Sequence, residues 1–526
     1  MRINGNVADL ILAQLAEWGV ERIYGVLGDA IFPLLDAISR QDKIKFIAVT
    51  GEVHAAFMSS YEARLTGKLS VCAASAGPGA VSLLNGLADA FMDGSPVLAI
   101  TGQVESKEIG AGVKQYFDQQ ALFSSFVEQT NIAVEPGSVL SMLVAAVRTA
   151  KLNNSVAHTS IPKDVFAKAV SIETMSASFV EINSAPFVSG SLDNILQVVQ
   201  CSQKPLIIAG RMAKIVKEQV FKLVDLLGAG LIVAREAKGK IAGQHELNLG
   251  GIGKAYLPPV LHEADCIIII GAASYEREFI PQGTSVIQIN DRFENIYQNT
   301  VESISGNTGL ILENLLQRLD GHSFNRDWLE EIKRLVQNRR QELAAESANN
   351  TKPISPLRLM LDLNNIMPGE AIIALDIGEF THWFNLGFQG EQQEILLSGR
   401  WRSIGCGLPA AIGAKFACPK KPVIAMVGDG GFIASMSELL TCVRYSLDIC
   451  VIIVKNHIYS IEKNKMLAEG LIPSGYELTV PDFVQFAKSC GAEGYRIDDP
   501  ADIQNTIRAA LELGKPALVE VICADN

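Results

Sequence analysis

The sequence has no Cys-x-x-Cys pair, no leader-like start and no long apolar run. Its nine cysteines are scattered and odd in number, which predicts reduced thiols in a cytoplasmic compartment and excludes a disulfide framework. No basic stretch followed by an apolar segment opens the chain, so we expect no signal peptide. No apolar run approaches the ~18 residues that span a bilayer, so no stable membrane anchor is expected.

A surplus of basic residues is also missing. The 45 Lys and Arg residues are outnumbered by 57 Asp and Glu residues, which gives a net charge of −12. Because binding of a nucleic-acid backbone needs a basic surface, no nucleic-acid partner is expected. The chain does have 526 residues, 48% of them hydrophobic. At ~150 residues per domain this is enough for about three globular domains.

Short apolar segments alternate with helical stretches along the whole chain. This alternation is typical of βαβ units, and it predicts an α/β fold with three doubly wound parallel-sheet domains. We place the domains at residues 1–174, 190–345 and 356–526, with a Ser-rich linker at 175–191 between the first two. The predicted buried strands include Leu69–Ala73, Val97–Thr101, Cys266–Gly271, Ala371–Leu375, Val423–Val427 and Cys450–Val454.

Two predicted strands of the third domain end in polar residues that suit a cation. One strand is followed directly by Asp429, and the next ends at Asn456. Because the carboxyl ends of parallel strands meet at one edge of a sheet, we expect these two side chains to lie close together. A carboxylate and an amide oxygen are ligands that Mg²⁺ accepts beside water and phosphate oxygens. Ile458 could add its backbone carbonyl.

Glycines surround Asp429 in the segment Gly428-Asp429-Gly430-Gly431. Glycine lets a diphosphate approach the backbone closely, and the helix that follows would point its N-terminus at the phosphates. A bare Gly-Asp-Gly is also a common turn. The strand before it and the spaced Asn456 favour a magnesium–diphosphate site.

Taken together, these motifs resemble a known family. The Gly-Asp-Gly segment with the spaced Asn is similar to the thiamine diphosphate (ThDP) motif, and Ser75-Ala76-Gly77-Pro78-Gly79 and Asp376-Ile377-Gly378 extend the likeness. Over nearly its whole length the chain resembles the ThDP-dependent group of pyruvate oxidase, acetolactate synthase and pyruvate decarboxylase, with pyruvate oxidase-like members nearest. The resemblance implies ThDP and Mg²⁺ as cofactors, with the metal on Asp429, Asn456 and Ile458. It assigns cofactor binding to Gly28, Gly79, Gly378, Ile404, Gly428, Gly430, Gly431 and Ile458.

The resemblance also implies a catalytic carboxylate, Glu52. Such a glutamate shares a proton with the cofactor's aminopyrimidine ring, and apolar surroundings raise its pKa for that task. From the residues alone, the preferred interpretation of Glu52 is an acid that complements a helix dipole. The family often has His before this glutamate, where this chain has Gly51; we expect His54 to be a packing or surface residue. Ile404 matches the apolar wedge that bends the cofactor, although plain core packing would also explain it.

Three further residues are implied to act near the substrate. Gln115 aligns with a family glutamine, but the usual Phe before it is Lys114, which would either attract a second negative charge or face solvent. Glu462 and Asp29 match acids of the decarboxylases, where two acids with different pKa values could handle protons. The adjacent histidine pair of those decarboxylases is absent. Segments 108–112 and 466–478 look instead like quinone-reducing pyruvate oxidases, although we do not expect the C-terminal membrane-binding extension of that type.

The central domain leaves FAD open. Oxidases and acetolactate synthases of this group hold FAD there, and Gly250-Gly251-Ile252-Gly253 fits loosely. However, the turn at Gly210 lacks a second glycine, and Asn290 and Asn307 stand where Asp is common. FAD is therefore possible but doubtful.

The expected function is that of a ThDP- and Mg²⁺-dependent enzyme. It would decarboxylate a 2-oxo acid, pyruvate by default, and pass the enamine to an acceptor; oxidation, ligation and protonation remain open, and with them the classes oxidoreductase, transferase and lyase. The resemblance implies active sites at a subunit interface and hence a homodimer or homotetramer. The alternatives are a non-oxidative decarboxylase, a non-catalytic nucleotide-binding paralogue, and a nicotinamide dehydrogenase suggested by Gly405-x-Gly407-x-x-Ala410.

Overall fold

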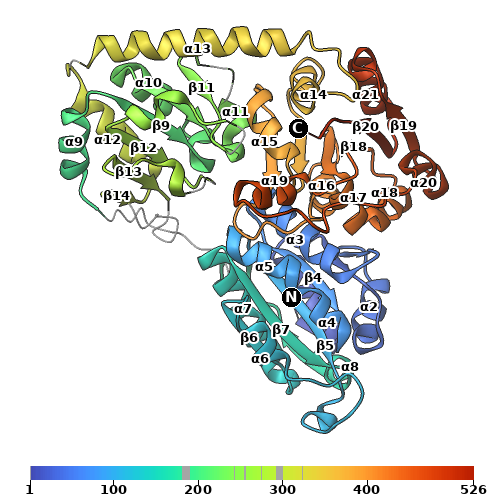
Figure 1. Ribbon diagram of the computed structural model, residues 1–526. Helices are drawn as coiled ribbons and strands as arrows, with labels where there is room; N and C mark the ends of the chain where they lie inside the picture. The colour runs from blue at the N-terminus through green and yellow to red at the C-terminus, as the bar shows by residue number, and fades with distance from the viewer. Residues whose placement is uncertain are drawn as a thin grey trace.

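The chain folds into three α/β bodies, each built on a six-stranded sheet. The computed structural model describes residues 2–179, 190–291 and 300–525, except 242, 244, 254, 255, 274, 276 and 323; much of the expected linker lies outside these residues. In Figure 1 the first body lies below the other two, which sit side by side. The predicted fold class, three doubly wound parallel sheets, is confirmed. The sheets span residues 22–162, 205–305 and 372–522, and the exact domain boundaries stay predictions.

The first sheet is parallel throughout, and its central strands are apolar because helices cover both faces. A small antiparallel ribbon of β1 (Arg2–Asn6) and β8 (Ala169–Glu173) joins the two ends of this domain. In spatial order the strands are β3 (Lys45–Ala48), β2 (Arg22–Gly25), β4 (Ser70–Ala74), β5 (Val97–Gln103), β7 (Val156–Pro162) and β6 (Gln129–Ile132). The helices are α1 (Val7–Glu17), α2 (Phe32–Ser39), α3 (Glu52–Thr66), α4 (Pro78–Ser82), α5 (Leu84–Asp93), α6 (Gln119–Phe123), α7 (Val139–Asn153) and α8 (Lys163–Ala167).

The third sheet repeats the strand order of the first. Numbered within each domain, both read 2-1-3-4-6-5, so the two outer domains share one topology. In spatial order the strands are β16 (Glu394–Leu397), β15 (Ile372–Leu375), β17 (Val423–Gly428), β18 (Ile449–Lys455), β20 (Ala517–Ile522) and β19 (Glu493–Ile497). The helices are α14 (Pro356–Leu363), α15 (Phe380–Gly387), α16 (Gly407–Ala417), α17 (Asp429–Ser435), α18 (Leu439–Arg444), α19 (Ser460–Ala468), α20 (Phe483–Cys490) and α21 (Ile503–Glu512).

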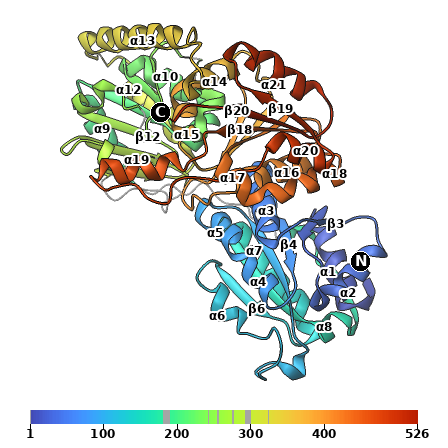
Figure 2. The same ribbon diagram turned by 45° about the vertical axis from the view of Figure 1, so that its right-hand side comes forward.

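The middle sheet differs, since its order within the domain is 3-2-1-4-5-6, the doubly wound order of dinucleotide-binding folds. Its strands are β11 (Asn248–Gly250), β10 (Gly230–Val233), β9 (Pro205–Ala209), β12 (Cys266–Ile270), β13 (Ser285–Asn290) and β14 (Glu302–Ser305). The helices are α9 (Leu192–Cys201), α10 (Lys217–Leu227), α11 (Lys238–Ile241), α12 (Thr308–Leu319) and α13 (Arg326–Glu346). The long helix α13 runs along the top of the molecule from the middle domain toward the third (Figures 1 and 2).

The first and third domains share one continuous core. Helix α3 packs against α16, and Figure 2 shows α3 directly beneath the third domain. At Gly413 the helices approach so closely that a Cβ there would lie only 2.4 Å from the backbone oxygen of Met58. Phe57 and Tyr61 of α3 bury their rings in the same cluster as Ile412 of α16. This packing fixes the orientation of α3, whose first residue is Glu52.

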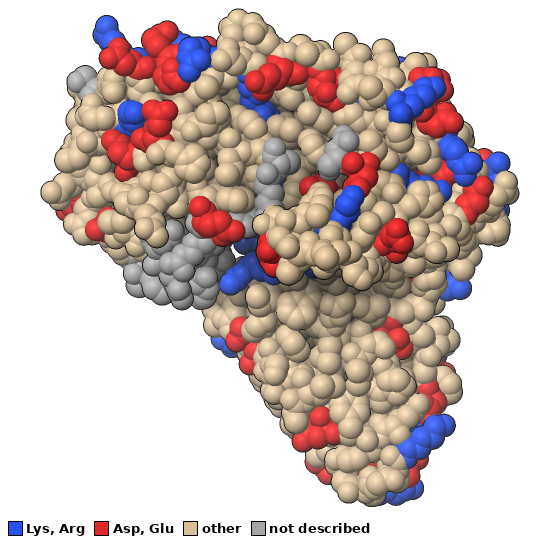
Figure 3. Space-filling view, in the orientation of Figure 1, with Lys and Arg blue, Asp and Glu red and all other residues tan. Residues whose placement is uncertain are grey.

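Two further expectations concern cysteines and membranes. All nine cysteines are free, and six of them are buried, as expected for reduced thiols that pack as small apolar side chains. Within the described part of the chain, no helix combines the length and apolar character needed to cross a bilayer. On the face seen in Figure 3, acidic and basic side chains are interspersed rather than separated into single-sign patches.

Candidate cofactor site

The polar residues that end β17 and β18 lie side by side at one edge of the third sheet. The two strands are neighbours, with Gly428 paired to Val454. The Oδ2 atom of Asp429 accepts hydrogen bonds from the backbone N–H groups of His457 at 2.6 Å and Asn456 at 3.2 Å. Its Oδ1 atom accepts from the N–H of Gly430 at 2.9 Å. The juxtaposition expected from the strand order is therefore present.

The oxygen atoms of Asp429 and Asn456 are of the kind that bind a hard divalent cation. Burial raises the pKa of Asp429, while its three backbone hydrogen bonds oppose that shift. The amide of Asn456 is oriented, since its Nδ2 donates to Ser460 Oγ at 2.6 Å and its Oδ1 accepts from the N–H of Ile458. Among the described residues, no group of three or more His, Cys, Asp and Glu side chains could hold a metal. A cation here would need the amide and a backbone carbonyl as well as the carboxylate.

The backbone at Ile458 is fixed by a short antiparallel contact. Ile458 bridges to Glu477, and the residues on either side of it bond to the same segment: Tyr459 N–H donates to the Tyr476 carbonyl at 2.7 Å, and Leu478 N–H donates to the His457 carbonyl at 2.8 Å. This ladder holds the peptide whose carbonyl was proposed as a ligand.

The glycines near Asp429 are needed for two different reasons. A Cβ at Gly430 would lie 2.5 Å from Tyr459 Cε1, and one at Gly431 would lie 2.9 Å from Asp376 Cγ, so the protein's own packing excludes larger residues there. A Cβ at Gly428 would meet nothing closer than 3.8 Å. The space beside Gly428 thus remains for a group that approaches the strand end.

Asp376, at the end of β15, is a site residue to which the sequence analysis gave no role. Its Oδ1 accepts from Gly405 N–H and its Oδ2 from Gly407 N–H, each at 2.9 Å. The side chain is fully buried, and burial raises the pKa of Asp376 to about 6. Asp376 thereby pins the turn that carries Ile404, whose side chain is 41% exposed although it is aliphatic. An acid at a strand end two residues before a glycine was the signal that could have found it.

Glu52 stands at the opposite part of the candidate site, on the first domain. It is the first residue of α3, after Gly51 in extended conformation. Its carboxylate lies beside the start of α4, as a Cβ placed on Gly79 would be only 3.0 Å from Glu52 Oε1. A Cβ at Gly28 would lie only 2.3 Å from the Cβ of Ser75, so a larger residue does not fit there. Gly79 therefore borders the Glu52 carboxylate, whereas Gly28 packs against Ser75.

The three predicted substrate residues lie on the surface of a single chain. Gln115 is exposed, has a φ of 67°, and packs against Gly77 in the turn before Gly79. The Asp29 and Glu462 side chains are each 61% exposed, and each pairs with a lysine: Lys163 at 3.5 Å and Lys465 at 3.0 Å. Each of the two acids pairs with a lysine rather than with the other acid, and their convergence at one substrate stays a prediction. Lys114 is exposed as well.

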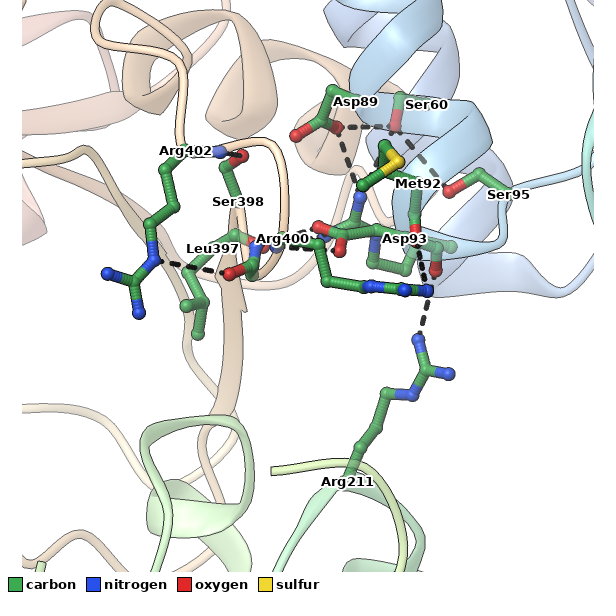
Figure 4. A network of polar contacts seen from close by, with 12 residues as sticks. Ser60, Asp89, Met92, Asp93, Ser95, Arg211, Leu397, Ser398, Arg400 and Arg402 are labelled. Atoms are coloured by element: carbon green, nitrogen blue, oxygen red, sulfur yellow. Dashed lines mark hydrogen bonds and ion pairs between the residues drawn. The ribbon is translucent and has the colours of Figure 1, made fainter. Parts of the chain in front are cut away.

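A cavity of about 360 Å³ lies where the three domains meet. Figure 4 shows how its wall is built: Asp93 accepts from the backbone N–H groups of Gly399 at 2.7 Å and Arg400 at 3.0 Å, and its backbone oxygen accepts from Arg211 at 3.1 Å. Arg211 follows β9 of the middle sheet, in the turn that lacks a second glycine. Asp291, after β13, also lines the cavity, next to Asn290. Binding of FAD in or near this cavity stays a prediction.

The fold and the site define a class: an α/β protein whose outer domains repeat one topology, with a carboxylate–amide pair at a strand edge of the third. Residues 5–122, 192–315 and 376–521 match the N-terminal TPP binding, central, and C-terminal TPP binding domains of thiamine pyrophosphate enzymes, thiamine pyrophosphate being ThDP. The chain belongs to the thiamine pyrophosphate enzyme family.

Individual relatives align over almost the whole chain. The "Putative thiamine pyrophosphate-containing protein YdaP" of Bacillus subtilis (strain 168) is 31% identical, covering 97% of this chain and 90% of its own length. A catabolic acetolactate synthase of Raoultella terrigena is 29% identical, with 98% and 94% covered. The large subunit of acetolactate synthase isozyme 1 of Escherichia coli (strain K12) is 26% identical, with 98% and 93% covered.

Proposed function

We propose that this chain is a ThDP- and Mg²⁺-dependent enzyme that decarboxylates a 2-oxo acid, pyruvate by default, and transfers the remaining carbon unit to an acceptor. The observation that carries the proposal is the pairing of Asp429 with Asn456 at the ends of β17 and β18. The Asp429 carboxylate accepts from the backbone N–H of Asn456 at 3.2 Å and from that of His457 at 2.6 Å. Family membership supports the proposal.

The residues present fit both cofactors. Asp429, Asn456 and the Ile458 carbonyl would hold Mg²⁺ through three oxygen ligands. Gly428 leaves room for the diphosphate, and the amides that open α17 would face its negative charge. Gly378 would border the same phosphates. Bound in this way, the thiazolium of ThDP would supply the electron sink that decarboxylation requires.

Glu52 and Ile404 would prepare the cofactor for reaction. The Glu52 carboxylate, half-buried beside Gly79, would accept a hydrogen bond from the aminopyrimidine ring and share its proton. Ile404, projecting from a turn that Asp376 pins, would hold the two rings at the bend that brings the amine to the reacting carbon. A wedge role explains why this aliphatic side chain is 41% exposed.

A second copy of the chain would complete the active site. Large apolar side chains are exposed next to both groups of predicted site residues: Leu27 at 61% beside Gly28 and Val81 at 47% near Gly79, and Ile404 at 41% and Leu467 at 53% on the third domain. Exposed apolar surface of this kind marks an interaction site. A homodimer or homotetramer that covers both edges would bring Asp29 and Gln115 of one subunit toward Glu462 of another.

The acceptor step decides between subtypes. A pyruvate oxidase-like reaction would pass the carbon unit to an electron acceptor, and an acetolactate synthase-like reaction would pass it to a second carbonyl compound. FAD could be a further ligand in either case. A non-oxidative decarboxylase is the second candidate, favoured by the acids Asp29 and Glu462 at the surface that a partner would cover.

Product analysis tests the proposal. Purified protein with ThDP and Mg²⁺ is incubated with pyruvate alone, with a quinone or dye acceptor, and with an added aldehyde. We expect CO₂ release that needs both cofactors, and acetate, acetolactate or acetaldehyde would identify the subtype. No CO₂ from pyruvate or from a panel of larger 2-oxo acids would contradict the proposal.

A further inference from the structure

A buried carboxylate of the third domain, Glu438, holds residues on both sides of Glu52. Glu438 ends the short helix η10 that follows α17, and it is fully buried. Its Oε1 atom accepts hydrogen bonds from the backbone N–H of Thr50 at 3.0 Å and from Nδ1 of His54 at 2.7 Å. The Thr50 hydroxyl donates to the same oxygen. Glu52, two residues from each partner, lies between two attachments to the third domain.

The contact between Glu438 and His54 is buried, whereas Thr50 lies at the exposed side of the cluster. Burial alone would raise the pKa of Glu438, but the hydrogen bonds and charge of His54, together with hydrogen bonds from Thr441 and Thr50, hold that pKa below its usual value. Thr441 Oγ1 supplies the bond to Oε2 at 2.6 Å. The His54 side chain is itself buried. A buried carboxylate that loses one partner bears a desolvation penalty, so the surrounding turn would shift to satisfy it.

Helix α3 has no device of its own that fixes its first turn. Its N-cap residue is Gly51, which offers no side-chain cap. A Cβ at Gly51 would approach His54 Nδ1 to 3.3 Å, tighter than most real contacts. The family often has His at this position. Gly51 leaves room for the bond between His54 and Glu438. The orientation of the helix start is set from the third domain rather than by a local cap.

We propose that His54 and Glu438 are positioning residues that fix the Glu52 carboxylate by clamping the turn from which it projects. The inference rests on the proposed role of Glu52 and adds two residues that do not contact the cofactor. Because Glu438 closely follows α17, which begins at Asp429, the clamp also connects the turn of Glu52 to the metal-site helix of the same chain, although the two would serve different active sites of the assembly. Displacing a reacting group by ~1 Å can cost ~10²-fold in rate.

Kinetics of paired variants test the proposal in the holoenzyme. His54→Leu removes the bond, whereas His54→Asn keeps it, because the Asn Nδ2 can replace the ring Nδ1. We expect His54→Leu to lower kcat by ~10- to 100-fold with KM and ThDP affinity little changed, and His54→Asn to restore most of kcat. Tyr445→Phe is the matched control: it removes another bond between the same domains, from Ala48 N–H to the Tyr445 hydroxyl at 2.8 Å, and should leave kcat unchanged.

Hydrogen exchange of the cofactor-free protein gives a readout independent of turnover. The Thr50 amide should exchange faster in His54→Leu and Glu438→Leu than in wild type or Tyr445→Phe. Wild-type kcat in His54→Leu, or His54→Asn as impaired as His54→Leu, would overturn the proposal. If Glu438→Leu does not fold, the His54 pair carries the test. If wild type acts on no 2-oxo acid, the proposed function fails, and unchanged Thr50 exchange in His54→Leu would separately refute the clamp.

Discussion

Replacing Asp376 by Asn should remove a pH dependence of stability that the third domain carries. Burial raises the pKa of this carboxyl from 3.8 to about 6. Because the folded-state pKa lies above the unfolded one, the folded chain binds the proton more tightly. The stabilisation is complete below the unfolded pKa and is lost as pH rises through about 6. A shift of about 2 units corresponds to about 3 kcal/mol in the free energy of unfolding.

Chemical denaturation of apo-protein in a chelator, from about pH 4.5 to pH 7.5, would measure this effect. Trp383 and Trp401 belong to the third domain and report its unfolding by fluorescence. The stability of wild type minus that of Asp376→Asn should fall by about 2 kcal/mol across the range, because about 1 kcal/mol of the effect is already lost at pH 4.5; the exposed control Asp498→Asn should show no such slope. A flat or rising difference would mean that the backbone N–H donors outweigh burial and that Asp376 stays ionised.

Four further predictions follow from the site and the packing. Glu52→Gln should bind ThDP normally but lose about 10²- to 10⁴-fold in kcat; a wild-type rate would remove Glu52 from the chemistry. Asp429→Ala should abolish the Mg²⁺ dependence of ThDP affinity measured by calorimetric titration, and an unchanged dependence would move the metal elsewhere. Gly413→Ala should destabilise the protein by about 1–3 kcal/mol, seen as a lower Tm, because its methyl would lie 2.4 Å from the Met58 carbonyl oxygen; an unchanged Tm would show that the helices can separate cheaply. Flavin absorption bands in freshly purified protein would establish FAD binding, and a colourless protein that gains no bands on adding FAD would exclude it.

Much of the site could be predicted because it depends on local pattern and a general rule of parallel sheets. Asp429 and Asn456 each follow an apolar strand, and the carboxyl ends of neighbouring strands meet at one edge. The structure places them together as expected. Glu52 was singled out through the family resemblance, since the residues alone indicated only an acid at a helix start. The functional roles of these residues remain predictions that the experiments above test.

The rest depends on contacts between distant segments. Asp376 acts through Gly405 and Gly407, and nothing in its neighbourhood in the sequence indicates those partners. Glu438 meets His54 across 384 positions, so a histidine interpreted as ordinary packing turned out to be one half of a buried pair. The strand orders of the sheets were also beyond reach, because alternating strands and helices fit many topologies.

Asp29 and Glu462 mark a different limit. Each is exposed and paired with a lysine within one chain, so a meeting between them depends on a surface contributed by another copy. Periodicity and motif spacing describe a single chain and say nothing of which exposed edges face each other in an assembly. The exposed apolar side chains near both residues are the structural observation that favours such an edge.

A structure of the assembled protein with ThDP and Mg²⁺ tests the central claim most directly. The account predicts one cofactor per active site, with Mg²⁺ on Asp429, Asn456 and the Ile458 carbonyl of one subunit. The carboxylate of Glu52 of the partner subunit should lie within hydrogen-bond distance of the aminopyrimidine ring. A cofactor bound elsewhere, or a Glu52 carboxylate out of reach of that ring from either chain, would contradict it.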